Sequence, residues 1–237
     1  MPPRSPAVPL LLLPGLACDA ELFRHQQPAL QALGQVAVSD VHTREATLTA
    51  MAARQLAEHP GPLALAGASM GGMLALHAWR LAPQRVRGLA LLGTTARADT
   101  PAQIRLRTEG IAAFEAGRMD EILTANLVFA FHPANAARLA ADYGAMIRRA
   151  GVPQLVAQNR AVMAREDLRP QLGAITCPLL VMGGDSDGLT PPECAREIAA
   201  AVPQARLEIL AGCGHMLTWE RPDAVTAALG DWWRALA

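Results

Sequence analysis

The sequence has 237 residues, of which 51% are hydrophobic and 18% are charged, so it can bury a sizeable core and does not have the composition of a disordered chain. Its 21 basic residues balance 21 acidic ones, and no basic run stands out, which argues against a nucleic-acid partner. The length predicts one large α/β domain, or one such domain with an insertion.

Two features of the composition bear on location. The apolar run within residues 1–15 is only a few residues long and is broken by prolines, so we expect neither a signal peptide nor a membrane span. The four cysteines include no C-x-x-C pair, which predicts reduced thiols and no zinc site. The resulting expectation is a cytoplasmic protein with no membrane partner.

Short apolar strands alternate with helices over residues 1–94. Such an alternation predicts right-handed crossovers and a parallel sheet. A helix is expected to follow Asp19, whose side chain can cap it. The expected strands are 8–13, 36–41, 63–67 and 86–94, and the helices between them are 21–33, 48–59 and 70–81.

The alternation stops between residues 95 and 172, which contain no convincing strand. We interpret residues 95–172 as a helical lid inserted into an α/β core made of residues 1–94 and 173–237, with about six mainly parallel strands flanked by helices. The expected elements are helices 101–115, 119–131, 134–150 and 153–164 in the insertion, then strand 179–183, helix 192–201, strand 206–210 and a helix from Pro222 to the end.

The most informative stretch is Leu63–Gly72, LALAGASMGG. An apolar strand turns through a G-x-S-x-G pattern centred on Ser69 into a helix, which is the context of a nucleophile elbow. The flanking glycines let the strand and helix backbones approach closely. The alternatives are a turn that only packs tightly, or one that holds a phosphate, although no G-x-x-x-x-G-K-[ST] pattern is present.

A serine nucleophile needs a base, and the base needs an orienting carboxylate. In an elbow-type sheet these follow in the order serine, acid, histidine, at the carboxyl ends of later strands. Asp185 and Asp187 follow strand 179–183, and we assign a turn role to Asp185 and the orienting role to Asp187. His215 follows the next strand in the required order. The other histidines are interpreted as surface or packed residues, and His132 can also line the pocket.

The mechanism also needs donors for a developing oxyanion. The expected donors are the backbone N–H of Met70, directly after the nucleophile, and that of Leu16, in the loop after the first strand. One such donor is worth on the order of 3 kcal/mol in the transition state. Because both are backbone groups, the side chains at these positions are free to line an acyl pocket.

Together these residues carry a family resemblance. The chain resembles the α/β-hydrolase superfamily, in the small lidded branch that includes esterases, enol-lactonases and cofactor-free perhydrolases, over nearly its whole length. Pro14 stands where the family usually has a histidine, and we expect the first two strands of the full fold to be absent. The motifs are Leu13-Pro14-Gly15-Leu16, Gly67-Ala68-Ser69-Met70-Gly71-Gly72, Gly184-Asp185-Ser186-Asp187 with Thr190-Pro191, and Gly212-Cys213-Gly214-His215. The segment 158–165, with Arg169-Pro170, is similar to the end of the lid in enol-lactonase-like members.

The resemblance implies a serine hydrolase that cleaves a small carboxylic ester or lactone. Ser69 would attack the carbonyl carbon, His215 would carry the proton, and Asp187 would hold the imidazole, with no metal or organic cofactor. A thioesterase, a C–C bond hydrolase or a perhydrolase would use the same three residues. A ligand receptor of this fold would keep them without turnover. These alternatives remain open at this point.

The helical insertion is expected to form most of the substrate pocket. Arginines in the same insertion, Arg105, Arg107 and Arg160, are interpreted as solvated side chains, with a clamp for a substrate carboxylate as the alternative. The apolar residues proposed to line the pocket are Leu127, Phe131, Met146, Val162 and Met163.

Overall fold

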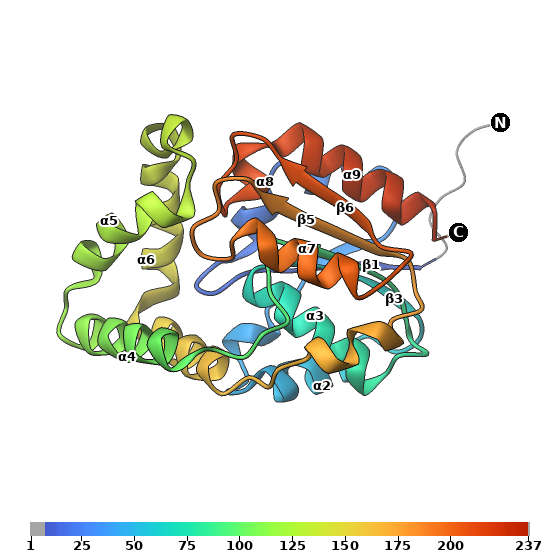
Figure 1. Ribbon diagram of the computed structural model, residues 1–237, viewed down its shortest axis with the longest axis horizontal. Coiled ribbons are helices and arrows are strands. Elements are labelled where there is room, and N and C mark those ends of the chain that lie inside the picture. Colours follow the sequence, from blue (N-terminus) through green and yellow to red (C-terminus); the bar gives the residue numbers. More distant parts are fainter. Residues whose placement is uncertain (1–7, 237) are drawn as a thin grey trace.

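A computed structural model describes residues 8–236 of the chain. Expectations for residues 1–7, and for the last residue of the C-terminal helix, Ala237, lie outside the described residues. Figure 1 shows a sheet between two layers of helices, with a group of further helices beyond one end of the strands.

A six-stranded sheet forms the centre of the core, in the order β2-β1-β3-β4-β5-β6. Each strand pairs in parallel with its neighbours, in agreement with the predicted sheet. The strands are β1 (Leu10–Leu13), β2 (Val36–Val38), β3 (Leu63–Ala68), β4 (Val86–Leu92), β5 (Leu179–Gly184) and β6 (Arg206–Leu210).

Helices and short 3-10 turns connect the strands. The α-helices are α1 (Gln27–Gln31), α2 (Leu48–Glu58), α3 (Met70–Leu81), α4 (Pro101–Glu115), α5 (Met119–Ala130), α6 (Pro133–Met163), α7 (Pro192–Ala200), α8 (Leu217–Glu220) and α9 (Pro222–Arg234). The 3-10 turns are η1 (Ala20–Phe23), η2 (Val41–Thr43) and η3 (Arg169–Ala174).

Helices cover both faces of the sheet, and successive side chains of a strand point to opposite faces. In β1, Leu10 and Leu12 pack with α1, α8 and α9, whereas Leu11 and Leu13 pack with α2, α3 and α7. This explains why the inner strands β1, β3 and β5 are continuous apolar runs, whereas the edge strands β2 and β6 are partly exposed. The side chains on these two faces form the two hydrophobic clusters of the core.

Helices α4, α5 and α6 lie beyond the carboxyl ends of the strands, toward which β5 and β6 point (Figure 1). The long helix α6 is kinked at Gly151, whose φ of 75° and ψ of 168° are not helical. It therefore consists of two helical segments, in agreement with the predicted break near Gly151. The bounds of α4 agree with the predicted helix 101–115.

The expected single helix over residues 21–33 is wrong. The structure has η1 and the short α1 instead, separated by Arg24–Gln26. Pro28 has no N–H to continue a helical ladder across this break. The buried Gln26 side chain instead donates a hydrogen bond to the carbonyl of Thr218, at 3.0 Å. The predicted cap is confirmed, since Asp19 Oδ1 accepts from the N–H of Glu21 at 2.9 Å.

Candidate active site

Ser69 lies in a sharp turn between β3 and α3. Its backbone angles are φ 53° and ψ −118°. For a residue other than glycine this conformation costs roughly 1 to 3 kcal/mol and persists only where the surrounding structure holds it. The turn also brings β3 and α3 unusually close, since a Cβ atom on Gly67 would lie 2.2 Å from the carbonyl oxygen of Gly71. Thr94 Oγ1 secures the turn by donating to the Ser69 carbonyl at 2.7 Å.

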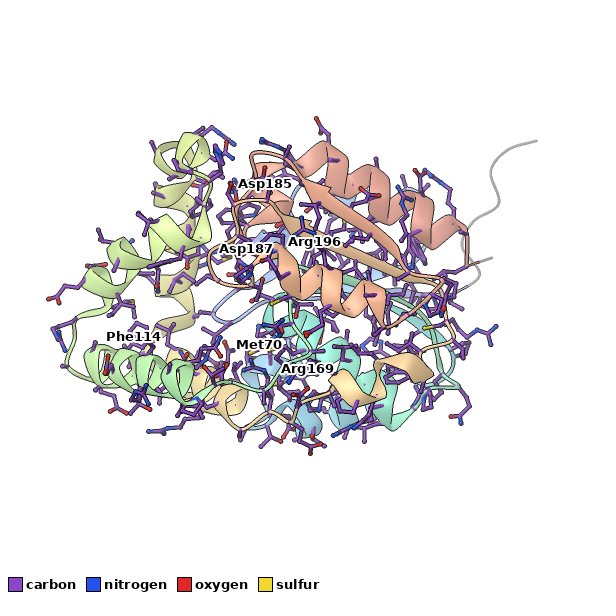
Figure 2. The ribbon with its side chains drawn as sticks, in the orientation of Figure 1. Met70, Phe114, Arg169, Asp185, Asp187 and Arg196 are labelled. Atoms are coloured by element: carbon purple, nitrogen blue, oxygen red, sulfur yellow. The ribbon has the colours of Figure 1, made fainter. Side chains whose placement is uncertain are left out.

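The two aspartates after β5 have different partners. Both lie at the end of the sheet nearest the helical insertion (Figure 2). Asp185 accepts hydrogen bonds from the N–H groups of Gly212 and Cys213, at 2.9 and 3.2 Å. It thereby ties its own loop to the loop that carries His215. Asp187, which is only 3% exposed, is the aspartate that contacts the imidazole of His215.

Asp187 and His215 form a buried pair. Asp187 Oδ2 is 2.8 Å from His215 Nδ1 and also accepts from Thr190 Oγ1 at 2.8 Å. Asp187 Oδ1 accepts the N–H groups of Leu189 and Thr190, both at 2.8 Å. These contacts fix the carboxylate, and no residue between 8 and 236 forms a hydrogen bond with Nε2 of His215.

Burial and the neighbouring charges shift the pKa values of His215 and Asp187 in opposite directions. Burial alone would lower the pKa of His215, but the charge and hydrogen bond of Asp187, with the charge of Glu220, outweigh it and raise the pKa above 6.5. Burial likewise would raise the pKa of Asp187, but the interactions with His215 and Thr190 lower it overall. Asp187 is therefore ionised at neutral pH.

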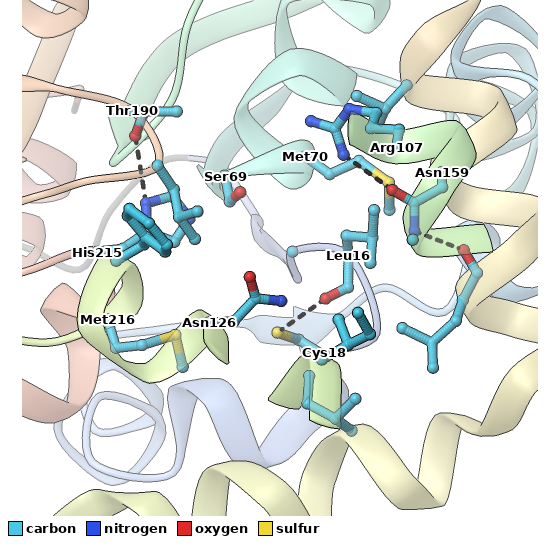
Figure 3. Close-up of a pocket in the computed structure, with 18 of the residues that line it drawn as sticks. Leu16, Cys18, Ser69, Met70, Arg107, Asn126, Asn159, Thr190, His215 and Met216 are labelled. Carbon is cyan, nitrogen blue, oxygen red and sulfur yellow. Dashed lines mark hydrogen bonds between the residues drawn. The ribbon is translucent and has the colours of Figure 1, made fainter. Parts of the chain in front are cut away.

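A cavity of about 790 Å³ opens between the ends of the strands and the helical insertion. Ser69 and His215 both line it, together with Leu16 and Met70 (Figure 3). Within residues 8–236 the Ser69 hydroxyl has no hydrogen-bond partner, so the structure forms no Ser69–His215 hydrogen bond. Such contacts commonly tighten only when substrate is bound.

The loop after β1 touches the serine turn. A Cβ atom on Gly15 would lie 3.3 Å from Ser69 Cβ, which places the Gly15–Leu16 peptide against the serine. The N–H groups of Leu16 and Met70 have no acceptor in the part of the chain that the structure describes. Both are therefore available to an atom bound beside Ser69.

Of the five apolar residues predicted to line the pocket, Val162 alone is in the cavity wall. Phe131 and Met146 are fully buried in the core, and Phe131 packs edge-on behind Tyr143, with ring centroids 5.3 Å apart. Leu127 packs against the same core and Met163 contacts Thr108 at its sulfur. The prediction is thus corrected for four residues. Besides Val162, the apolar wall from the insertion consists of Leu106, Ala113, Phe114, Ile122, Leu123, Phe129, Tyr143, Ile147 and Leu155.

Arg107 is the predicted arginine that reaches the cavity wall. Its Nε donates to Asp99 at 2.7 Å and its Nη1 donates to Asn159 at 2.9 Å (Figure 3). Arg160 lies 3.5 Å from Glu115 on the exposed surface, and Arg105 is also exposed. His132 is outside the wall, where its Nδ1 accepts the Ala134 N–H at 3.2 Å.

Two buried polar residues next to the site were assigned no role from the sequence. Glu220 accepts from the N–H of Gly214 at 2.9 Å, directly before His215, and from the N–H of His132 at 2.9 Å. Gln158 of α6 accepts from the N–H of Ala17 at 2.6 Å, in the loop after β1. Each joins the helical insertion to a loop of the site, and only the folded chain brings these partners together.

Residues 8–236 lack two other kinds of feature. No group of three or more histidine, cysteine, aspartate or glutamate side chains is arranged to hold a metal ion in this part of the chain. No helix among the same residues has the length and apolar character needed to cross a membrane.

Comparison with known proteins places this geometry in context. Residues 32–222 match the family model Hydrolase_4, described as serine aminopeptidase, S33. The chain is 28% identical to a pimeloyl-acyl-carrier-protein methyl ester esterase of Edwardsiella ictaluri (strain 93-146), over 93% of this chain and 91% of the relative.

Solved structures of α/β hydrolases share the fold. A thermophilic esterase from Thermogutta terrifontis with malate bound is 26% identical, with a TM-score of 0.83 over 98% of this chain and 92% of that one. The enol-lactonase from Burkholderia xenovorans LB400 is 25% identical, with a TM-score of 0.83 over 95% and 91% of the two chains. The expected α/β-hydrolase fold is confirmed.

Proposed function

The chain belongs to the Hydrolase_4 family (serine aminopeptidase, S33), and we propose that this carboxylic ester hydrolase acts on an ester or lactone through an acyl-enzyme formed on Ser69. The observation that carries the proposal is the pairing of His215 with the buried Asp187 at 2.8 Å, in a cavity that Ser69 also lines. A serine, a histidine with one free ring nitrogen and a buried carboxylate are the parts that nucleophilic acyl transfer requires.

In the proposed reaction, Ser69 Oγ attacks the ester carbonyl carbon and gives its proton to Nε2 of His215. The Nδ1–H of His215 donates to Asp187, which keeps the correct tautomer and stabilises the imidazolium. The N–H groups of Leu16 and Met70 donate to the oxyanion of the tetrahedral intermediate.

The intermediate collapses as the C–O bond to the alcohol breaks and His215 protonates the leaving oxygen. Water then attacks the acyl-enzyme, with His215 accepting a proton from it. A second collapse returns that proton to Ser69 and releases the carboxylic acid.

Residues 95–172 serve in this proposal as a lid over the acyl group. Two backbone hydrogen bonds tie the insertion to the loops of the site: the N–H of Gly188 donates to Phe129 at 3.0 Å, and the N–H of His215 donates to Ala130 at 2.9 Å. The lid therefore supports the acid and histidine loops as well as walling the cavity.

We propose a methyl ester, or another ester of a small alcohol, with an acyl chain of medium length as substrate. The cavity volume of about 790 Å³ is within the range of small-molecule sites, and its wall is mainly apolar. The name of the Edwardsiella ictaluri relative supports a methyl ester. We also propose a cytoplasmic location, where cysteines remain reduced thiols.

The test is hydrolysis of p-nitrophenyl esters from acetate to octanoate and of the matching methyl esters, with wild type and Ser69→Ala side by side. Loss of the nucleophile should lower kcat by several orders of magnitude. Turnover by wild type alone supports the proposal, and the preferred chain length then measures the pocket. Equal turnover by both proteins contradicts the role of Ser69. Binding without turnover by either favours a receptor.

A further inference from the structure

Gln158 connects the helical insertion to the loop that follows β1. Its side chain is 1% exposed, and its Oε1 accepts a hydrogen bond from the N–H of Ala17 at 2.6 Å. We infer that Gln158 is a positioning residue, which holds the turn around Leu16 so that the Leu16 N–H stays directed at the substrate oxygen. This inference rests on the proposed function, because it assigns Gln158 a task only if Leu16 is an oxyanion donor.

The turn that carries Leu16 is strained. The N–H of Cys18 donates to the carbonyl of Gly15 at 3.1 Å, which closes a four-residue turn with Leu16 and Ala17 at its centre. Ala17 has a φ of 56°, in the left-handed region that turns of this kind normally give to glycine or asparagine. An alanine stays in this region only where its surroundings hold it.

Gln158 supplies that restraint in one orientation of its amide. Its Nε2 donates to the carbonyl of His42 and to Oε1 of Gln154, both at 3.0 Å. A reversed amide would set an NH₂ group against the Ala17 N–H and an oxygen against the His42 carbonyl. The amide oxygen must therefore face Ala17, so the Leu16–Ala17 peptide is held in one direction.

The same network holds the far side of the turn. His42 Nε2 lies 2.8 Å from the carbonyl oxygen of Cys18, and His42 is buried. His42 Nδ1 has no partner within residues 8–236, which agrees with a neutral ring that carries its proton on Nε2 and donates to Cys18. Gln158 and His42 thus bind the two residues that follow Leu16.

This turn is in direct contact with Ser69, so a small movement of the turn changes the geometry around the serine. Because a Cβ atom on Gly15 would lie 3.3 Å from Ser69 Cβ, the turn packs against the nucleophile without an intervening side chain. A misplacement of about 1 Å in a catalytic geometry can lower a rate by about a hundredfold. Release of Ala17 from Gln158 should therefore weaken transition-state stabilisation while leaving substrate binding nearly unchanged.

The experiment compares Gln158→Met with wild type on p-nitrophenyl butyrate and measures kcat, KM, Tm and the affinity for a trifluoromethyl ketone that forms a tetrahedral adduct. We expect kcat to fall by about tenfold to a hundredfold, KM to stay within about threefold, and the affinity for the ketone to fall by a factor similar to that for kcat. Gln158→Glu keeps an acceptor for Ala17 but sets a second oxygen against the His42 carbonyl, so it should recover kcat only at a pH where the buried carboxyl group is protonated and can donate.

The matched control is Gln204→Met. Gln204 also donates through Nε2 to a backbone carbonyl, that of Ile175 at 2.7 Å, but it is not in the cavity wall. This variant should keep kcat within about twofold of wild type. Should Gln158→Met fail to fold, Gln158→Asn withdraws the same acceptor by one methylene and should show the same loss of kcat.

A double variant distinguishes an effect of the turn conformation on kcat from an effect of overall stability. Glycine at position 17 removes the strain of the positive φ, so Ala17→Gly should restore part of the kcat that Gln158→Met loses. A Gln158→Met protein with kcat within twofold of wild type, whatever its Tm, would overturn the positioning role alone if Ser69→Ala is inactive. If Ser69→Ala keeps wild-type turnover, the proposed function fails, and the positioning role fails with it.

Discussion

The N–H of Gly214 donates a hydrogen bond of 2.9 Å to Oε1 of Glu220, a buried carboxylate directly behind His215. The other carboxylate oxygen accepts the side-chain amide of Asn135, at 2.8 Å, from the start of α6. Glu220 therefore holds the histidine loop and the helical insertion together, and its charge contributes to the raised pKa of His215.

We predict that Glu220→Gln shifts the pH dependence of kcat/KM. In wild type the acid limb should lie above pH 6.5, because His215 must be neutral to act as a base and its pKa is raised. Removal of the Glu220 charge lowers that pKa, so the limb should move to lower pH. In this variant the side-chain NH₂ group replaces an oxygen that accepts hydrogen bonds from N–H donors. One donor then loses its acceptor, and the free energy of unfolding should fall by about 1 to 3 kcal/mol.

The control for this shift is Glu193→Gln. Glu193 pairs with Arg196 at 3.1 Å on the exposed face of α7, so its loss should leave both the acid limb and the stability in place. A Glu220→Gln enzyme whose acid limb coincides with that of wild type would contradict the electrostatic role of Glu220.

Asp187→Asn should lower kcat by roughly 10⁴-fold, because an amide does not hold the His215 tautomer that can accept the serine proton. Asp185→Asn should instead lower Tm while kcat stays within about tenfold, since Asp185 binds the N–H groups of Gly212 and Cys213 and not the imidazole. Steady-state kinetics and thermal melts of the two variants check this assignment. The reverse order of effects on kcat would contradict it.

We predict that the protein loses stability in acid because of the buried His77. Burial, with the charge of Arg80, lowers the pKa of His77 from 6.5 to about 4, so the unfolded chain binds the proton more tightly. The stability that this provides is complete above pH 6.5 and is lost as the pH falls toward 4, by about 3 kcal/mol. Urea unfolding at several pH values should show a flatter dependence for His77→Gln, whereas the variant of an exposed histidine, His25→Gln, should retain the wild-type slope.

Val162 is expected to affect acyl-chain selectivity because it is buried in the cavity wall. Val162→Ala should shift the ratio of kcat/KM values for octanoate and butyrate esters toward octanoate by up to about tenfold. Met163→Ala, one position along the same helix and outside the wall, should leave that ratio unchanged. Equal shifts in both variants would indicate a general loosening of the insertion.

The strands and the three proposed catalytic residues could be predicted because their signals are local. Ser69 and Asp187 each follow an apolar run that reads as a buried strand, whereas His215 follows the partly exposed edge strand β6. Parallel strands bring their carboxyl ends to one edge of the sheet. The bounds of β6 agree with the predicted strand 206–210. Strand–turn–helix order alone therefore located these loops.

The cavity wall could not be predicted, because it depends on how the helices of the insertion are rotated against one another. Phe114 and Phe131 are equally apolar in sequence, yet Phe114 lines the cavity and Phe131 is packed behind Tyr143. The roles of Gln158 and Glu220 could not be predicted either, since their partners are 141 and 6 residues away in sequence and meet them only after folding.

The most direct test of the central claim is to trap the acyl-enzyme. The protein is mixed with p-nitrophenyl butyrate, quenched in acid within the first turnover and analysed by peptide mass spectrometry. We predict a butyryl group on the peptide that contains Ser69, at up to one per chain, which is absent in Ser69→Ala and strongly reduced in His215→Ala. Steady turnover with no acyl group on Ser69, or with the acyl group on another residue, would contradict the account.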